Sequence, residues 1–147
     1  MLLRLLMAAL LLVTGAIAGL LGAAALLRGW FASRGDETSD ELDLVAIFDG
    51  VERANHATAF RRARILTWFG AASLDLREAT IAPEASLDIR TLLGGVSVHL
   101  PPGCRVGSET SVVLGGVDVR APEPEDPAAP TVRLQVATVF GGVSVES

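Results

Sequence analysis

Alternation of apolar and polar residues runs through most of the chain after residue 44 and follows a repeated motif. Each copy has an aromatic residue or Leu, then a pair containing Gly, then the alternation, and the five copies begin at Phe48, Phe69, Leu93, Leu114 and Phe140. These leading residues are 21, 24, 21 and 26 positions apart. A period of two is typical of half-buried strands, and self-similarity at such spacing is typical of stacked repeats. The pattern therefore predicts a mainly β fold.

Glycine recurs at one point of every copy, where the chain would turn between two strands. Glycine adopts positive φ and tolerates close backbone approach without strain. We therefore predict corners at Gly50, Gly70, Gly94, Gly95, Gly115, Gly116, Gly141 and Gly142. Further strands are predicted over Arg64–Thr67, Ser86–Thr91 and Thr131–Ala137. Replacing Gly95 or Gly116 by Val is expected to destabilise the domain.

The repeat predicts a β-solenoid-like stack of short strands in which corner lies on corner. Units of such a stack are stable against their neighbours. The leading residues would then form an inward-facing core ladder made of Phe48, Phe69, Leu93, Leu114 and Phe140. The alternative is an antiparallel sandwich of hairpins with glycine bulges.

The amino-terminal part of the chain, residues 1–31, is predicted to be a transmembrane anchor. Leu5 to Leu27 is a 23-residue run in which Thr14 is the one polar side chain. A helix of that length reaches about 34 Å, enough to cross a bilayer core. A signal peptide cleaved near Ala25 is the alternative, although apolar regions of signal peptides are usually shorter. Arginines on both sides of the run leave the membrane orientation open.

Two segments follow the predicted anchor. Residues 32–43 mix Ser, Gly, Asp and Glu without apolar periodicity, which predicts an acidic, solvated juxtamembrane linker. Residues 44–147 are long enough for one small core and are predicted to form the β domain.

The ordered blocks of this domain resemble a known family. DLREA (75–79), LLGGVSVHLPPGCRV (92–106), VLGGVDVR (113–120), a Pro-rich loop and VFGGVSVES (139–147) resemble the carboxy-terminal, toast-rack-like domain of LiaF-like cell-wall-active antibiotic response proteins. The resemblance implies a β-solenoid-like domain held at a bacterial membrane. It also implies a role in restraining a sensor histidine kinase and its response regulator. Such proteins often have several transmembrane helices, whereas this chain has one candidate.

Charge and composition argue against several functions. The chain carries 12 basic and 17 acidic residues, a formal net charge of −5, whereas a nucleic-acid binder needs a basic face. His56, His99 and Cys104 match no ligand spacing or catalytic triad. We therefore expect no catalytic residue, no cofactor and no metal site. The basic cluster Arg61, Arg62 and Arg64 is a candidate contact for lipid or for an acidic partner.

Together these features predict a non-enzymatic, single-pass protein of the bacterial cell membrane. Its β domain would bind other proteins, a sensor histidine kinase among them, and modulate envelope-stress signalling. The alternative is a membrane-tethered structural scaffold that forms homo-oligomers end to end through unpaired strand edges.

Overall fold

The computed structural model describes residues 2–30 and 33–147, and it divides the chain into two units, 1–32 and 33–147. Unit one contains the helix α1 (Leu2–Trp30). The described side chains of α1 are exposed, and the Thr14 hydroxyl donates a hydrogen bond to the Leu11 carbonyl at 3.1 Å. All the predicted corners and core residues lie in unit two, residues 33–147, which we call the β unit.

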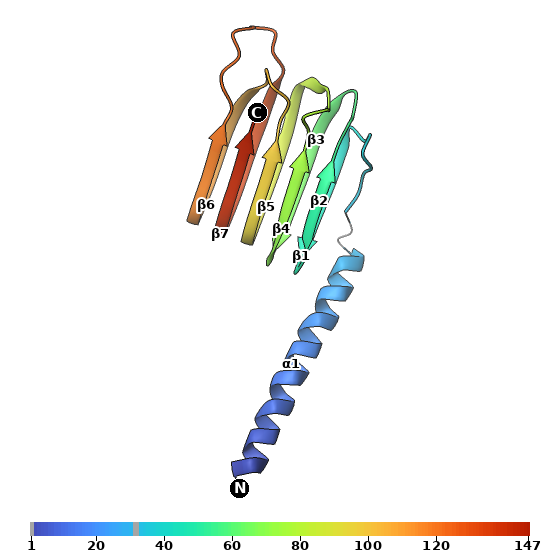
Figure 1. Cartoon of the computed structure of the whole chain (residues 1–147), viewed down its shortest axis with the longest axis vertical. Coiled ribbons are helices and arrows are strands. Elements are labelled where there is room, and N and C mark those ends of the chain that lie inside the picture. The colour runs from blue at the N-terminus through green and yellow to red at the C-terminus, as the bar shows by residue number, and fades with distance from the viewer. Residues whose placement is uncertain (1, 31–32) are drawn as a thin grey trace. The chain divides into compact units, whose positions relative to one another are not determined.

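The β unit is built from parallel strands, which confirms the predicted mainly β fold. All its strand pairs are parallel, so the alternative of antiparallel hairpins is wrong. The order of the strands is not the order of the chain, because β7 lies between β5 and β6 (Figure 1). The strands are β1 (Glu41–Ile47), β2 (Gly50–Ala54), β3 (Phe60–Trp68), β4 (Gly70–Asp75), β5 (Ile81–His99), β6 (Arg105–Arg120) and β7 (Thr131–Glu146).

A corner divides the strands into two halves. One half contains β1, β3 and the first parts of β5, β7 and β6, and the other contains β2, β4 and the second parts of the same three strands. Apolar side chains fill the space between the halves. Before the corner they include Leu44, Ile65 and Ile89, and after it Leu74 and Val98, all at most 1% exposed. Period-two alternation thus gives each half one buried face.

The corner depends on the first glycine of each Gly-Gly pair. Gly94 pairs in register with Gly70 and Gly141, and Gly141 pairs with Gly115. The φ angles of Gly94, Gly115 and Gly141 are +144°, +142° and +153°. A Cβ atom on Gly94 would lie 1.7 Å from the carbonyl oxygen of Gly70, and one on Gly141 would lie 1.9 Å from that of Gly94. Neighbouring backbones therefore leave no room for a side chain.

The second glycine of the pair carries no such constraint. A Cβ atom on Gly95 would make an ordinary contact of 3.8 Å, and one on Gly116 would meet no atom within 4 Å. The loss of stability that the sequence predicted for substitutions at Gly95 and Gly116 is therefore expected at Gly94 and Gly115 instead. In the first two motif copies the positive φ is held by Phe48 and Phe69, at 53° and 51°.

The predicted inward ladder of leading residues is wrong. Phe48, Phe69, Leu93, Leu114 and Phe140 share one register row, but each is between 37% and 56% exposed. At the bend, the glycine backbones of adjacent strands approach each other too closely to leave room for a side chain. The leading side chains are therefore displaced to the convex side, and the nearest buried row is that of Thr67, Thr91 and Thr138, two positions earlier in each strand.

The predicted linker, 32–43, also differs from the structure. Residue 32 lies outside the described residues, but Arg34 forms an antiparallel bridge with Asp43, and the Ser33 hydroxyl accepts a hydrogen bond from the Val45 amide. Asn55 is buried and donates to the Ser39 carbonyl at 2.9 Å. Hydrogen bonds from Ser39 and Thr38 lower the pKa of Asp36 within this segment. Residues 33–40 thus cover the free edge of β1.

A row of three threonines lies inside the corner. Thr67, Thr91 and Thr138 occupy one register row and are at most 3% exposed. Their hydroxyl oxygens have no hydrogen-bond partner among the described residues. A buried, unpaired hydroxyl costs free energy that a methyl group of the same shape does not.

Gly94→Ala should destabilise the β unit by about 2–4 kcal/mol, because it combines backbone strain with overpacking. The matched control is Gly95→Ala, which should lie within about 1 kcal/mol of wild type. Urea unfolding followed by circular dichroism measures both. Equal stability of the two variants would contradict the corner geometry.

Thr91→Val should raise the free energy of unfolding by about 1 kcal/mol, because it replaces an unpaired buried hydroxyl by a methyl group. Thr91→Ala, which removes the buried methyl group as well, should be less stable than Thr91→Val. Denaturant melts of the three proteins decide between the alternatives. A Val variant less stable than wild type would mean that the hydroxyl has a partner.

Candidate interaction surface

The convex side of the corner carries a continuous apolar surface, which we call the corner band. It consists of two adjacent register rows. Each row has one residue from each of the five motif copies, which we call rungs. The residues are Ile47, Trp68, Leu92, Val139 and Val113 in one row, and Phe48, Phe69, Leu93, Phe140 and Leu114 in the other. Of these, Ile47 is buried, Leu92 and Val139 are partly exposed, and the other seven are exposed. The Phe48 and Phe69 rings are stacked with centroids 4.8 Å apart.

The corner band gathers almost all exposed large apolar side chains of the β unit. Of those described, Val112 is the exception, and it follows the band on β6. An apolar surface of this extent on a small domain is typical of an interaction site. The sequence motif identified these residues, but alternation alone placed them on the wrong face.

A shallow groove of about 790 Å³ runs across the strands beside the corner band. Its floor is almost bare backbone, because the row after the corner consists of four glycines and one alanine: Gly50, Ala71, Gly95, Gly142 and Gly116. The far wall is the row Glu52, Ser73, Ser97, Ser144 and Asp118. Five strands spaced by about 4.8 Å make the groove about 19 Å long. A carboxylate stands at each end, and three hydroxyls lie between.

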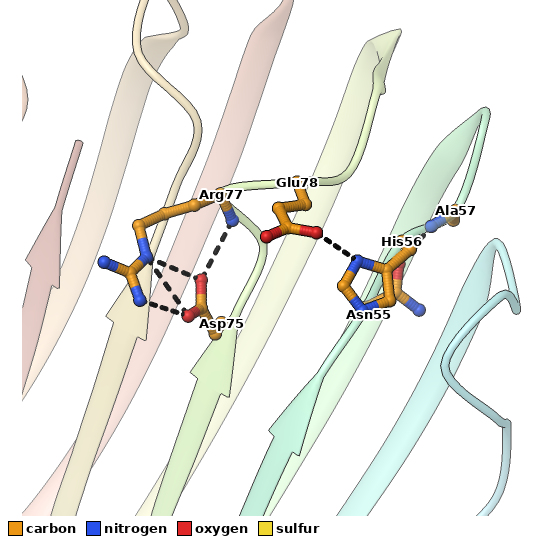
Figure 2. Close-up of polar contacts among 6 residues, drawn as sticks. All are labelled: Asn55, His56, Ala57, Asp75, Arg77 and Glu78. Atoms are coloured by element: carbon orange, nitrogen blue, oxygen red, sulfur yellow. Dashed lines mark hydrogen bonds and ion pairs between the residues drawn. The ribbon is translucent and has the colours of Figure 1, made fainter.

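The second polar feature is an ion pair at the end of β4 (Figure 2). The Arg77 guanidinium donates to both carboxylate oxygens of Asp75, and the Arg77 amide donates to the same carboxylate at 3.0 Å. These hydrogen bonds from Arg77 lower the pKa of Asp75 to about 2. Because the Arg77 side chain is 66% exposed, solvent screens the ion pair, which contributes little to stability.

The two histidines do not share a site. His56 Nδ1 lies 3.0 Å from Glu78 Oε2 in an exposed pair (Figure 2). His99 lies between Asp75 and Glu146 on neighbouring strands, an arrangement that sequence order did not reveal. Within the described residues, no group of three or more His, Cys, Asp or Glu side chains is placed to hold a metal ion.

The other candidate residues lie apart from the corner band. Cys104 is 2% exposed, and burial raises the pKa of its thiol, so it is poorly suited to nucleophilic attack. Arg61, Arg62 and Arg64 are exposed in the first part of β3, which begins at Phe60. Their register neighbours are acidic as well as neutral: Glu41 beside Arg62, and Asp43 and Asp88 beside Arg64. The cluster therefore does not form a uniformly basic face.

Comparisons with known proteins give few relatives. Two uncharacterized proteins of Mycobacterium tuberculosis match over 105 residues, one from strain CDC 1551 / Oshkosh at 30% identity and one from strain ATCC 25618 / H37Rv at 29%. Each match covers 70% of this chain and 52% of the relative, so the chain spans about half the length of these curated relatives. No protein-family model matches the chain, and no solved structure matches it at a significant level.

The predicted membrane anchor corresponds to the helix α1. Among the described residues, no helix is both long and apolar enough to cross a membrane. The predicted run, Leu5–Leu27, includes side chains outside the described ones. The membrane role of α1 stays a prediction.

The Asp75 carboxyl should titrate near pH 2 in the folded protein, because Arg77 stabilises its charged form. A folded pKa below the unfolded value means that the stabilisation is present above about pH 4 and is lost as the pH falls through 2. Arg77→Ala should raise the pKa of Asp75 towards 3.8. The pKa of Asp75 in the wild-type chain and in the variant is measured from the NMR chemical shift of its carboxyl carbon as a function of pH. The same titration midpoint in both proteins would contradict the pairing.

Proposed function

We propose that the chain is a non-enzymatic, membrane-anchored interaction module that modulates bacterial envelope-stress signalling, with a sensor histidine kinase as its partner. In this proposal the five rungs act as one solenoid-like stack. The rung of β7, the last in sequence, lies between the rungs of β5 and β6. The LiaF-like resemblance suggests the pathway, and the corner band supplies the physical reason for a partner.

The single observation that carries the proposal is the exposure of the corner band. Seven of the ten apolar positions in the two rows are at least 37% exposed at the bend, and Val113 is 72% exposed. Burying apolar surface stabilises an association by about 25 cal/mol per Å², and exposed patches of this kind are rare without a use. The fold does not need them outside for its own core. Their placement therefore favours a protein partner.

The groove beside the band suits an amphipathic segment lying across the strands. Its floor carries no side chain larger than the methyl group of Ala71, so a helix or an extended peptide can approach the backbone closely. The apolar face of such a segment would contact the corner band, and its polar face would contact the serine row. Glu52 and Asp118 would favour basic residues at the ends of the segment.

The membrane part of the proposal is supported by the composition of α1. The run Leu5–Leu27 has no charged residue, and its described apolar side chains, such as Leu11, Leu12 and Leu26, are exposed. The hydroxyl of Thr14 is paired within the helix, as a lipid environment requires. These features favour a helix whose surroundings are apolar.

The alternative, a scaffold that grows end to end, is less well supported by the edges of the β unit. Chain growth needs two complementary open edges. Residues 33–40 cover part of the β1 edge, and β2 is only five residues long. Among the described strands, a single open edge, that of β6, favours pairing of two copies over growth of a longer chain of copies.

A reporter of envelope stress, read in cells that produce the full chain, tests the proposal. Leu93→Ser with Phe140→Ser should abolish the effect of the protein on the reporter, because both substitutions make the corner band polar. Leu93 and Phe140 are 37% and 46% exposed, so the double variant also loses packing, and urea unfolding must show that it is folded at the assay temperature.

The matched control is Arg61→Ser with Arg64→Ser, which changes two exposed side chains outside the band and should leave the effect intact. A photo-crosslinker at Phe69 should capture the kinase, whereas one at Arg61 should not. A reporter that responds equally to the wild-type chain and the band variant would contradict the proposal.

A further inference from the structure

The open edge of the stack is β6, the longest uncovered edge of the β unit. Of the described strands, only β7 pairs with it, and none of its sixteen residues is buried. Such an edge presents a row of unpaired amides and carbonyls that can template another strand. Its middle, Thr110–Val117, has no charge and no proline, so the usual devices that block edge pairing are missing there.

The alternation of β6 changes phase at the corner. Before the corner, Ser108, Thr110 and Val112 lie in the inward rows, because their neighbours on β7 are the buried Leu134, Val136 and Thr138. After the corner, Val117 and Val119 lie in the inward rows, beside the buried Val143 and Val145. Inward positions are therefore even before the bend and odd after it.

This phase change restricts how two copies of β6 can pair. In an antiparallel pair related by a two-fold axis, the numbers of facing residues add to a constant. Inward residues face inward residues only if that constant is odd, since an even position must meet an odd one. Placing the two bends together sets Leu114 opposite Gly115, so the constant is 229.

The same register makes the edge complementary to itself in charge. It places Glu109 opposite Arg120 in both halves of the pair, where the Arg120 guanidinium also lies 2.8 Å from Asp118 of its own strand, and it places Ser111 opposite Asp118. It also places Val112 opposite Val117 inside the joined core. Facing side chains in an antiparallel pair lie about 5 Å apart, close enough for ion pairs. No like charges face each other between residues 109 and 120.

From this register we infer that the chain forms a two-fold symmetric dimer by antiparallel pairing of β6 with β6 of a second copy. The first half of each copy then continues into the second half of the other, and the two cores become one. The pairing covers the open end of the stack and leaves the corner band and the groove free along most of their length. It does not depend on α1 or on the proposed signalling role.

Charge reversal of the full chain in mild detergent tests the dimer by sedimentation equilibrium. Glu109→Arg and Arg120→Glu should each raise the dimer dissociation constant by about tenfold, because each places like charges opposite at two symmetric positions. The combined variant, Glu109→Arg with Arg120→Glu, should return to within about threefold of wild type, since the pair is restored with its signs exchanged.

Glu52→Arg is the control, because it makes the same charge change on β2, at the other end of the stack, and should not alter the dissociation constant. Rescue by the combined variant supports the β6 pairing and separates it from contacts between helices. A wild-type chain that stays monomeric, forms filaments, or dimerises without response to the single reversals would overturn the inference.

Discussion

Close approach of neighbouring backbones at the corner is the constraint on which the rest of the β unit depends. Gly70, Gly94, Gly141 and Gly115 lie in one register row, and a Cβ atom on Gly94, Gly115 or Gly141 would collide with a carbonyl oxygen of the next strand. The bend therefore occurs at the same place in each rung. Because the bends coincide, both halves keep parallel pairing on either side of them, and the apolar faces of the halves enclose one core.

The same constraint explains what the sequence could predict and what it could not. The alternation and the glycine pairs predicted strands and bends, since both follow from local rules about period and φ. The direction of Leu93 and its equivalents could not be predicted that way, because the space inside a bend is decided by the next strand. Nor could the position of β7 be read from the repeat, since the long connection 121–130 allows it to return between β5 and β6.

Three surfaces of the β unit follow from one geometry. The bend displaces the leading side chains outward and so makes the corner band. The row of small residues after the bend makes the groove, and the insertion of β7 leaves β6 as the final, uncovered strand. The side chains that could act as nucleophiles or bases lie outside these surfaces: Cys104, His56 and His99. These three surfaces are the basis of the proposed role in protein binding.

Disulfide trapping between neighbouring rungs tests the stacked corner and the strand order most directly. In a Cys104→Ser background, Ser97→Cys with Ser144→Cys should cross-link rapidly, since these residues pair in register on β5 and β7 and adjacent strands lie within disulfide reach. Ser97→Cys with Asp118→Cys should not cross-link within one chain, because β7 lies between β5 and β6. Efficient cross-linking of the second pair and none of the first would contradict the account.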